Sequence, residues 1–297
     1  MTPQPMDHDL RAATLVEALP YIHEFRGAVV VVKLGGNAMV DPDLASRFAE
    51  DIQLMRAVGL RPVVVHGGGP QIGELLARLG KETEFRDGLR VTDAETLDVA
   101  RMVLVGKVSR DIVSSLNRHA PVAVGLSGED AGLITAAARS PELGFVGDVV
   151  GVDPSIIQRL LAEDLIPVVS TIGADIEGQA YNINADTAAG AIAAALPAAK
   201  IVFLTDIVGL LANVDDTDTL ISATTPAELR DMITDGALAG GMIPKVRSCL
   251  DAVESGVRSA HILDGRRPHV LLLELFTDAG VGTMISEHPE QASVSRV

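Results

Sequence analysis

The sequence has few aromatic residues and only one cysteine. No tryptophan occurs, and aromatic residues make up 3 % of the 297 positions, although 47 % of the residues are hydrophobic. The core must therefore be built mainly from aliphatic side chains. Because Cys249 is the single cysteine, a disulfide framework or a cysteine-rich zinc site within one chain is excluded, and a reducing compartment fits.

Long apolar runs and an excess of positive charge are also absent. No stretch approaches the roughly 20 apolar residues that a membrane span requires, and the first residues lack the basic and apolar pattern of a signal peptide. The net charge of −16 opposes binding to nucleic acid or to an anionic membrane through long-range repulsion. We therefore expect a soluble, cytoplasmic protein that binds neither nucleic acid nor a membrane.

Several familiar catalytic motifs are missing as well. The phosphate-binding GxxxxGK[ST], the kinase triplet HRD and the zinc-binding HExxH do not occur, and Ile72 stands where a dinucleotide-binding fingerprint needs its third glycine. Gly125-Leu126-Ser127-Gly128 does not supply the GxSxG of a serine hydrolase. These absences exclude the commonest nucleotide-binding and hydrolase signatures.

Patterns of buried strands alternate with helical patterns along the chain. The apolar runs 29–34 and 62–65 are typical of strands buried on both faces of a parallel sheet. Further strands are predicted at 122–126, 168–169, 200–204, 260–263 and 283–285, with helices between them. This alternation predicts an α/β fold with an open, mainly parallel sheet sandwiched by helices. A short helical pattern before Gly27 predicts an N-terminal extension.

Two glycine-rich turns directly follow predicted strands, one at 33–37 (Lys-Leu-Gly-Gly-Asn) and one at 66–69 (His-Gly-Gly-Gly). Ligands of open α/β sheets bind at the carboxyl ends of the strands. Glycines there let backbone N–H groups approach an anion closely. Tight strand-to-helix turns are the plainer interpretation, but the presence of two such turns, one with Lys33 at the strand end, favours an anion site.

Two further segments hold polar residues whose role the pattern leaves open. Lys245 follows a proline in the first turn of a predicted helix, where a cation is disfavoured unless it faces an anion. In the segment 182–186 (Asn-Ile-Asn-Ala-Asp) the polar residues alternate and could point to one side, or Asn184 could simply cap the next helix.

Arg90 lies just before another predicted helix. Thr92 and Glu95 predict a capping box at the start of that helix. For Arg90 itself, a solvated side chain and a carboxylate clamp both remain open.

Five motifs in this order, at 33–39, 66–71, 88–92, 182–186 and 241–246, resemble those of the amino-acid kinase family, and within it of the acetylglutamate kinases. The resemblance extends from about Leu15 to Ile285. It implies the amino-acid kinase fold and the ATP-dependent phosphorylation of the side-chain carboxylate of N-acetyl-L-glutamate to N-acetyl-L-glutamyl 5-phosphate, in arginine biosynthesis. Mg²⁺ would accompany ATP as co-substrate, and no prosthetic group is expected.

The resemblance also implies roles for individual residues. The implied catalytic residues are Lys33, Lys245 and Asp186. The implied substrate-binding residues are Gly68, Gly69, Arg90 and Asn182. The implied phosphate-binding residues are Gly35, Gly36 and Gly68. The implied nucleotide-binding residues are Thr205, Asp206 and Gly209. No protein metal ligand is implied.

Feedback inhibition by L-arginine and a hexamer built as a trimer of dimers follow from the same resemblance. The implied effector contacts are Tyr21, Lys200, His261, Glu274 and Gly280. Residues 1–26 would form a helix for oligomer assembly, 27–184 an acetylglutamate-binding lobe, and 185–297 a nucleotide-binding lobe with an arginine-site segment near 261–283. A blander interpretation is that the N-terminal helix only covers the sheet and that Glu274 is a solvated charge.

Two alternatives remain beside this interpretation. Another member of the same family could act on aspartate, glutamate, carbamate or UMP. A catalytically dead arginine sensor or binding module could share the same fold, but the presence of Lys33, Asp186 and Lys245 argues against it.

Overall fold

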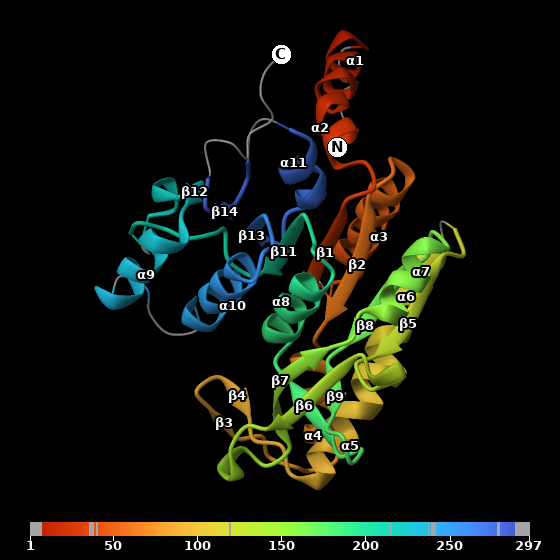
Figure 1. Cartoon of the computed structure of the whole chain (residues 1–297), viewed down its shortest axis with the longest axis vertical. Helices are drawn as coiled ribbons and strands as arrows, with labels where there is room; N and C mark the ends of the chain where they lie inside the picture. The colour runs from red at the N-terminus through yellow and green to blue at the C-terminus, as the bar shows by residue number, and fades with distance from the viewer. Residues whose placement is uncertain are drawn as a thin grey trace.

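A computed structural model of the chain (Figure 1) describes residues 8–35, 39, 41–118, 120–213, 216–236, 238, 242–277 and 280–288. Its α-helices are α1 (His8–Glu17), α2 (Leu19–Phe25), α3 (Pro42–Ala57), α4 (Gly69–Arg78), α5 (Ala94–Arg101), α6 (Ser109–Asn117), α7 (Ser155–Ala162), α8 (Ala185–Ala195), α9 (Pro226–Thr234), α10 (Met242–Glu254) and α11 (Val270–Phe276). A π-helix, η2 (Met102–Val108), joins α5 to α6, and short 3₁₀ turns lie at η3 (Asp130–Gly132), η4 (Pro141–Leu143) and η5 (Thr217–Thr219).

The strands form one large sheet, one small barrel and one hairpin. The large sheet has the order β12 (Ala223–Thr224), β14 (Thr283–Ile285), β13 (Ser259–Asp264), β11 (Lys200–Thr205), β1 (Val29–Leu34), β2 (Arg61–His66), β8 (Ile166–Ser170) and β5 (Ala123–Ser127). Within it, β13 and β14 run antiparallel and the other neighbouring pairs are parallel. The predicted open, mainly parallel sheet is thereby confirmed.

Helices cover both faces of this sheet because its strands are apolar on both sides. Along β1, Val31 packs into one core cluster with α7, α8 and α10, whereas Val30 and Val32 pack into a second cluster with α3, α6 and α11. All three valines are fully buried. β1 lies between β11 and β2 in the middle of the sheet, so its carboxyl end is enclosed on either side by neighbouring strand ends.

A small closed barrel lies beyond one end of the large sheet, and the sequence did not predict it. It consists of β10 (Ala180–Ile183), β7 (Val146–Val152), β6 (Ile134–Ala138) and β9 (Ile172–Ala174). Three of these strands have five residues or fewer, and β7 is interrupted by glycine and aspartate, so they lack the continuous apolar runs that mark β1 and β2. The hairpin of β3 (Phe85–Arg86) and β4 (Leu89–Arg90) stands beside it (Figure 1).

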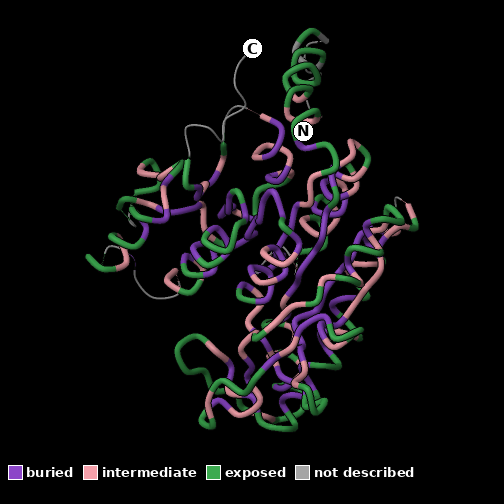
Figure 2. Tube along the Cα trace, viewed as in Figure 1, coloured by how far each residue is buried: buried purple, intermediate pink, exposed green. Residues whose placement is uncertain are grey.

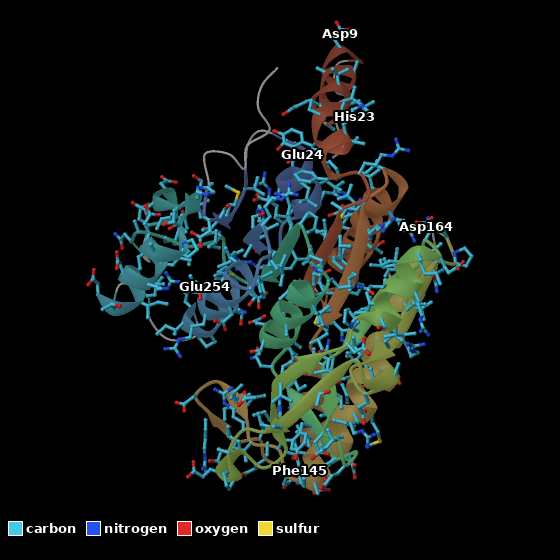
Figure 3. All side chains as sticks on the ribbon, in the orientation of Figure 1. Asp9, His23, Glu24, Phe145, Asp164 and Glu254 are labelled. Carbon is cyan, nitrogen blue, oxygen red and sulfur yellow. The ribbon has the colours of Figure 1, made fainter. Side chains whose placement is uncertain are left out.

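The N-terminal helices α1 and α2 project from the opposite end of the molecule (Figures 1 and 2). Asp9, His23 and Glu24 lie at this end, whereas Phe145 lies by the barrel (Figure 3). The predicted N-terminal extension is thus helical, and α2 anchors it through buried Phe25. Among the described residues, no helix has the length and apolar character needed to cross a bilayer. The predicted division at 184/185 falls between β10 and α8, and the large sheet contains strands from both sides of it.

Candidate active site

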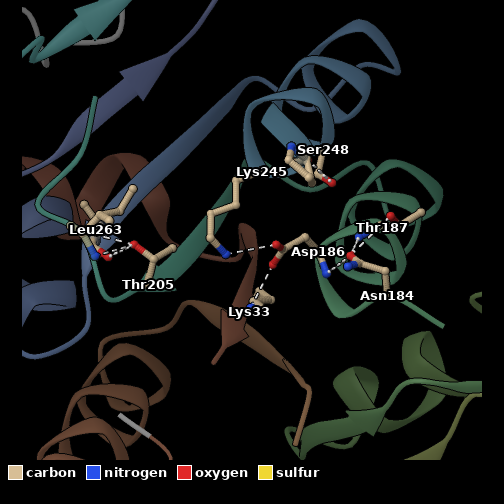
Figure 4. A network of polar contacts seen from close by, with 10 residues as sticks. Lys33, Asn184, Asp186, Thr187, Thr205, Lys245, Ser248 and Leu263 are labelled. Atoms are coloured by element: carbon tan, nitrogen blue, oxygen red, sulfur yellow. Dashed lines mark hydrogen bonds and ion pairs between the residues drawn. The ribbon is translucent and has the colours of Figure 1, made fainter. Parts of the chain in front are cut away.

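A buried carboxylate holds two lysine side chains at the carboxyl end of β1 (Figure 4). Asp186 Oδ1 lies 2.8 Å from Lys33 Nζ, and Asp186 Oδ2 accepts a hydrogen bond of 3.1 Å from Lys245 Nζ. The contact with Lys33 lacks hydrogen-bond alignment, so charge attraction accounts for it. Lys33 is 7 % exposed and Asp186 6 % exposed. The structure therefore brings together all three residues that the resemblance implies as catalytic.

Three different elements position these side chains. Lys33 is carried by β1, Asp186 by the first turn of α8, and Lys245 by the first turn of α10. Asn184 begins α8 as its N-cap, since its side-chain oxygen accepts hydrogen bonds from the backbone N–H groups of Asp186 and Thr187. The capping role that the sequence left open for Asn184 is thus confirmed. By fixing the start of α8, the cap also fixes the position of Asp186 in its first turn.

Electrostatics keep Asp186 ionised despite its burial. Burial alone would raise the pKa of this carboxyl, but the nearby charges of Lys33 and Lys245 outweigh that effect and lower the pKa below its usual value. The two ammonium groups share one negative charge, so the cluster carries net positive charge. An anionic ligand placed between the lysines would neutralise the remaining positive charge.

Gly35 leaves room for the Lys33 ammonium. A Cβ atom at Gly35 would lie 2.4 Å from Lys33 Nζ and 3.2 Å from Lys33 Cε, so any side chain there would displace the lysine. Gly36, the other predicted phosphate-binding residue of this turn, lies outside the described residues.

A cavity of about 510 Å³ opens beside this cluster. Lys33 and Gly35 line it at the end of β1, Gly67, Gly68 and Gly69 line it after β2, and Arg90 and Asn182 line it from the hairpin and the barrel. All the described residues that the resemblance implies for substrate or phosphate binding therefore meet at one cavity.

Arg90 is held in one orientation by the residues around it. Its Nη1 donates to Thr83 Oγ1 at 3.0 Å, its Nη2 donates to the carbonyl oxygen of Gly69 at 2.8 Å, and its Cζ lies 4.8 Å from the centre of the Phe85 ring. Burial lowers the pKa of Arg90, but a guanidinium remains charged at neutral pH. Its remaining N–H groups can bind a carboxylate in the cavity. Sequence reasoning missed Phe85, because an exposed aromatic residue in a two-residue strand carries no periodic signal.

Asn182 is linked to Arg90 through Thr92. The side-chain amide of Asn182 donates to Thr92 Oγ1 at 3.3 Å, and Thr92 Oγ1 donates to the carbonyl oxygen of Arg90 at 2.8 Å. The predicted capping box at Thr92 and Glu95 is wrong, because Asp93 caps α5 by accepting from the N–H of Thr96. The Thr92 hydroxyl is engaged with Arg90 and Asn182 instead, and it holds the two cavity-lining residues together.

The predicted nucleotide-binding residues lie at the carboxyl end of β11, next to β1 in the sheet. Thr205 Oγ1 lies 3.3 Å from the carbonyl oxygens of Leu263 and Ile207, which ties the following loop to β13 (Figure 4). Asp206 is exposed. Gly209 has a φ of +143°, and a Cβ there would lie 2.6 Å from Leu220, so glycine is required for the turn.

Three of the predicted effector residues, Lys200, His261 and Glu274, form a second polar cluster on β11, β13 and α11. His261 Nδ1 donates to Glu274 Oε1 at 2.7 Å, and His261 Nε2 lies 3.3 Å from Lys200 Nζ. A Cβ at Gly280 would lie 3.5 Å from Glu274 Oε2. Tyr21, on α2, packs against the same core cluster as Phe25.

The pKa values of the ionisable groups in this second cluster are shifted from their usual values. Burial lowers the pKa of Lys200 to about 8. Burial and the charge of Lys200 lower the pKa of His261. Burial would raise the pKa of Glu274, but the hydrogen bond and charge of His261 lower it overall. Glu274 is therefore a buried, hydrogen-bonded carboxylate and not a solvated one.

Comparison with known proteins identifies the family to which the chain belongs. The model of the amino acid kinase family matches residues 28–264. An acetylglutamate kinase of Halorhodospira halophila is 53 % identical over 98 % of this chain and 100 % of that protein.

Solved structures agree with this match. An N-acetylglutamate synthase from Neisseria gonorrhoeae, complexed with coenzyme A and N-acetyl-glutamate, is similar with a TM-score of 0.82 and 27 % identity, over 93 % of this chain. The chain spans only 63 % of the synthase's length. The synthase complexed with coenzyme A and L-arginine gives a TM-score of 0.78 at 26 % identity. The chain thus belongs to the amino acid kinase family, within it to the acetylglutamate kinase group, and is a kinase.

Proposed function

We propose that the chain transfers the γ-phosphoryl group of ATP to the side-chain carboxylate of N-acetyl-L-glutamate, forming N-acetyl-L-glutamyl 5-phosphate in arginine biosynthesis. The observation that carries this proposal is the Lys33–Asp186–Lys245 cluster beside a cavity that also holds Arg90 and Asn182. The 53 % identity to an acetylglutamate kinase supports the choice of substrate. The proposed compartment is the cytoplasm, where ATP is available and the buried thiol of Cys249 stays reduced.

The proposed reaction needs no general base. A carboxylate oxygen of acetylglutamate is already ionised at neutral pH and forms a bond to the γ-phosphorus. The bond from that phosphorus to the bridging oxygen breaks, and ADP leaves with the electron pair. Because negative charge spreads over the transferring group, catalysis consists of positioning and electrostatic stabilisation.

Each group of the site has a task in this reaction. Lys33 and Lys245 place positive charge on opposite sides of the transferring phosphoryl group, and Asp186 orients both lysines without touching substrate. The backbone N–H groups of Gly36 and Gly68 donate to the phosphoryl oxygens, while Gly35 and Gly69 shape the turns. Arg90 binds the α-carboxylate of acetylglutamate and Asn182 contacts the same substrate.

ATP is proposed to bind on the β11 side of the lysines, near Thr205, Asp206 and Gly209. The lobes proposed for the two substrates are 27–184 for acetylglutamate and 185–297 for the nucleotide. Among the described residues, no group of three His, Cys, Asp or Glu side chains is placed to hold a metal ion. Both oxygens of Asp186 are engaged by lysines. We therefore propose that Mg²⁺ enters with ATP, held by phosphates and water, and neutralises phosphate charge.

The proposal is tested by measuring ADP release with separate acceptors and trapping the acyl phosphate with hydroxylamine. Acetylglutamate should support turnover and give a hydroxamate, whereas glutamate, aspartate, carbamate and UMP should support far less. Preferred turnover of any of those four acceptors would reassign the substrate. An absence of ADP release with all of them, in the presence of Mg²⁺, would favour a binding module instead.

We further propose that L-arginine inhibits this kinase and that the protein is a hexamer, a trimer of dimers. Leu15 is 76 % exposed, Val16 68 % and Leu19 48 %, so the N-terminal helices present apolar side chains that a neighbouring copy could cover. Lys200 lies 4.8 Å from the Phe25 ring, which places the effector cluster in contact with α2. The likeness to a synthase complexed with L-arginine supports an arginine site here. In that site Glu274 would pair with the guanidinium, with Tyr21, Lys200, His261 and Gly280 around it.

Replacing either lysine of the cluster should reduce turnover. Lys33→Ala and Lys245→Ala should each lower kcat on the order of 10²-fold or more, with a smaller effect on KM for acetylglutamate, because both charges act mainly in the transition state. Arginine at either position should rescue poorly, since a planar guanidinium is not a compact ammonium. Steady-state kinetics measure both effects, and Lys107→Ala, at an exposed lysine paired with Asp111, is the control. Near-wild-type kcat in either variant would contradict a catalytic role for that lysine.

Removing the Arg90 side chain should instead weaken substrate binding. Arg90→Ala should raise KM for acetylglutamate by about 10- to 100-fold with little change in kcat, because the contact is made equally in the ground and transition states. Arg86→Ala is the matched control, since Arg86 lies on the same hairpin but is exposed and paired with Glu84. An unchanged KM for acetylglutamate together with a raised KM for ATP would mean that Arg90 lies on the ATP side, and the two proposed substrate positions would have to be reversed.

Deleting residues 1–17 should leave an active dimer that arginine no longer inhibits. The deletion removes α1 but keeps Phe25, which is part of the core. Sedimentation velocity gives the assembly, and kcat against arginine concentration gives the inhibition, which should be sigmoidal in the full chain. Leu15→Glu should likewise break the hexamer, whereas Ile176→Glu, at a residue 94 % exposed near the barrel, should not. A full-length dimer that ignores millimolar arginine would contradict this proposal alone.

A further inference from the structure

His66 is a fully buried histidine directly behind the glycine turn of the cavity. It is the last residue of β2 and is 0 % exposed. In the sheet it pairs in register with Leu34 of β1 and Ser170 of β8. Gly67, Gly68 and Gly69 line the cavity, but His66 does not. The imidazole therefore sits on the protein side of the turn.

The imidazole makes one hydrogen bond to the turn itself. His66 Nδ1 lies 2.9 Å from the carbonyl oxygen of Gly67. A carbonyl oxygen only accepts hydrogen bonds, so Nδ1 carries the hydrogen and donates. Burial and the charge of Arg110 outweigh this hydrogen bond and lower the pKa of His66 to about 4, so the ring is neutral at pH 7. Its other nitrogen, Nε2, is then a bare acceptor.

That second nitrogen is evidence that the imidazole is not there for packing. Nε2 is buried and has no hydrogen-bond partner among the residues that the structure describes. A buried acceptor without a partner is destabilising, and an aliphatic side chain of similar size would avoid that cost. Stability therefore does not explain why a histidine, with its hydrogen-bond donor at Nδ1, occupies this position.

The hydrogen bond orients the peptide group that joins Gly67 to Gly68. This peptide is trans, so its N–H points opposite to its carbonyl oxygen. Because His66 holds the oxygen, the N–H of Gly68 is turned away from the imidazole. On its other side, Gly68 is fixed by its own carbonyl oxygen, which accepts from Ile72 N–H at 2.9 Å in α4. A Cβ at Gly68 would lie 2.7 Å from Leu104 of the π-helix, so the side chain of Leu104 leaves no room for a larger residue in the turn.

We infer that His66 is a positioning residue whose Nδ1–H, by holding the carbonyl oxygen of Gly67, directs the N–H of Gly68 toward the transferring phosphoryl group. The inference rests on the proposed function, because it gives the Gly68 N–H a task in phosphoryl transfer. A preorganised donor of this kind stabilises charge that develops in the transition state. His66 itself touches no substrate.

Three variants separate this positioning role from a role in packing. Asn in place of His66 puts an amide N–H close to the position of Nδ1, Gln puts its amide near the position of Nε2, and Leu supplies no donor. His66→Asn should keep kcat within a few-fold of wild type. His66→Gln and His66→Leu should lower kcat on the order of 10- to 100-fold, with KM for acetylglutamate and ATP changed much less. His66→Leu should also unfold at the wild-type temperature or above, because it removes the unpaired Nε2.

Steady-state kinetics and thermal unfolding on the full-length protein measure these outcomes. Equal losses of kcat in the Asn and Gln variants would overturn the inference, and so would wild-type kcat in the Leu variant. A Leu variant that loses activity only in proportion to lost stability would overturn it too. The wild-type chain in the same assay keeps the two claims apart: if it fails to phosphorylate acetylglutamate, the proposed function fails, whereas the inference is decided by the ranking of variants on an active wild type.

Discussion

Two ammonium groups, those of Lys33 and Lys245, share the single carboxylate of Asp186 at the end of β1. Burying any one of these charges alone would be costly, and the triad is tolerated because the opposite charges compensate one another. With two ammonium groups to one carboxylate, that compensation is incomplete. The positive charge left over favours an anion at this position. Asp186 is held in this position because Asn184 fixes the start of α8, and a side chain at residue 35 would displace the Lys33 ammonium.

The side chains proposed to bind substrate are also held in fixed positions by their neighbours. Arg90 is restrained by a hydroxyl, a carbonyl oxygen and an aromatic face, and Thr92 connects its backbone to Asn182. The carbonyl oxygen of Gly68 is held by the Ile72 N–H of α4, and Leu104 of the π-helix leaves no room for a side chain at residue 68. Phosphoryl transfer to a carboxylate needs no proton transfer, so rigid placement of charges and donors is most of what a protein can contribute.

The sequence predicted the parts of this arrangement that local patterns determine. Apolar runs identified β1 and β2, and the glycines after them located the cavity, because strand ends and glycine turns have local signals. The small barrel was missed, since strands such as Ile172–Ala174 are too short to show a pattern. The cap of α5 was misplaced by one residue, because Thr92 and Asp93 can both cap a helix, and in the fold the Thr92 hydroxyl is engaged with Arg90 and Asn182. The stacking of Arg90 on the Phe85 ring became visible only in the folded hairpin.

The most direct test of this account is kcat of Asp186→Asn, which keeps the shape of the side chain but removes the charge that both lysines share. We predict that kcat falls on the order of 10²-fold or more while KM for acetylglutamate changes little, because the lysines lose their common anchor in the transition state and substrate is bound elsewhere. Asp148→Asn, at an exposed carboxylate paired with Arg139, should leave kcat unchanged. A folded Asp186→Asn enzyme with wild-type kcat would contradict the central role of the shared carboxylate.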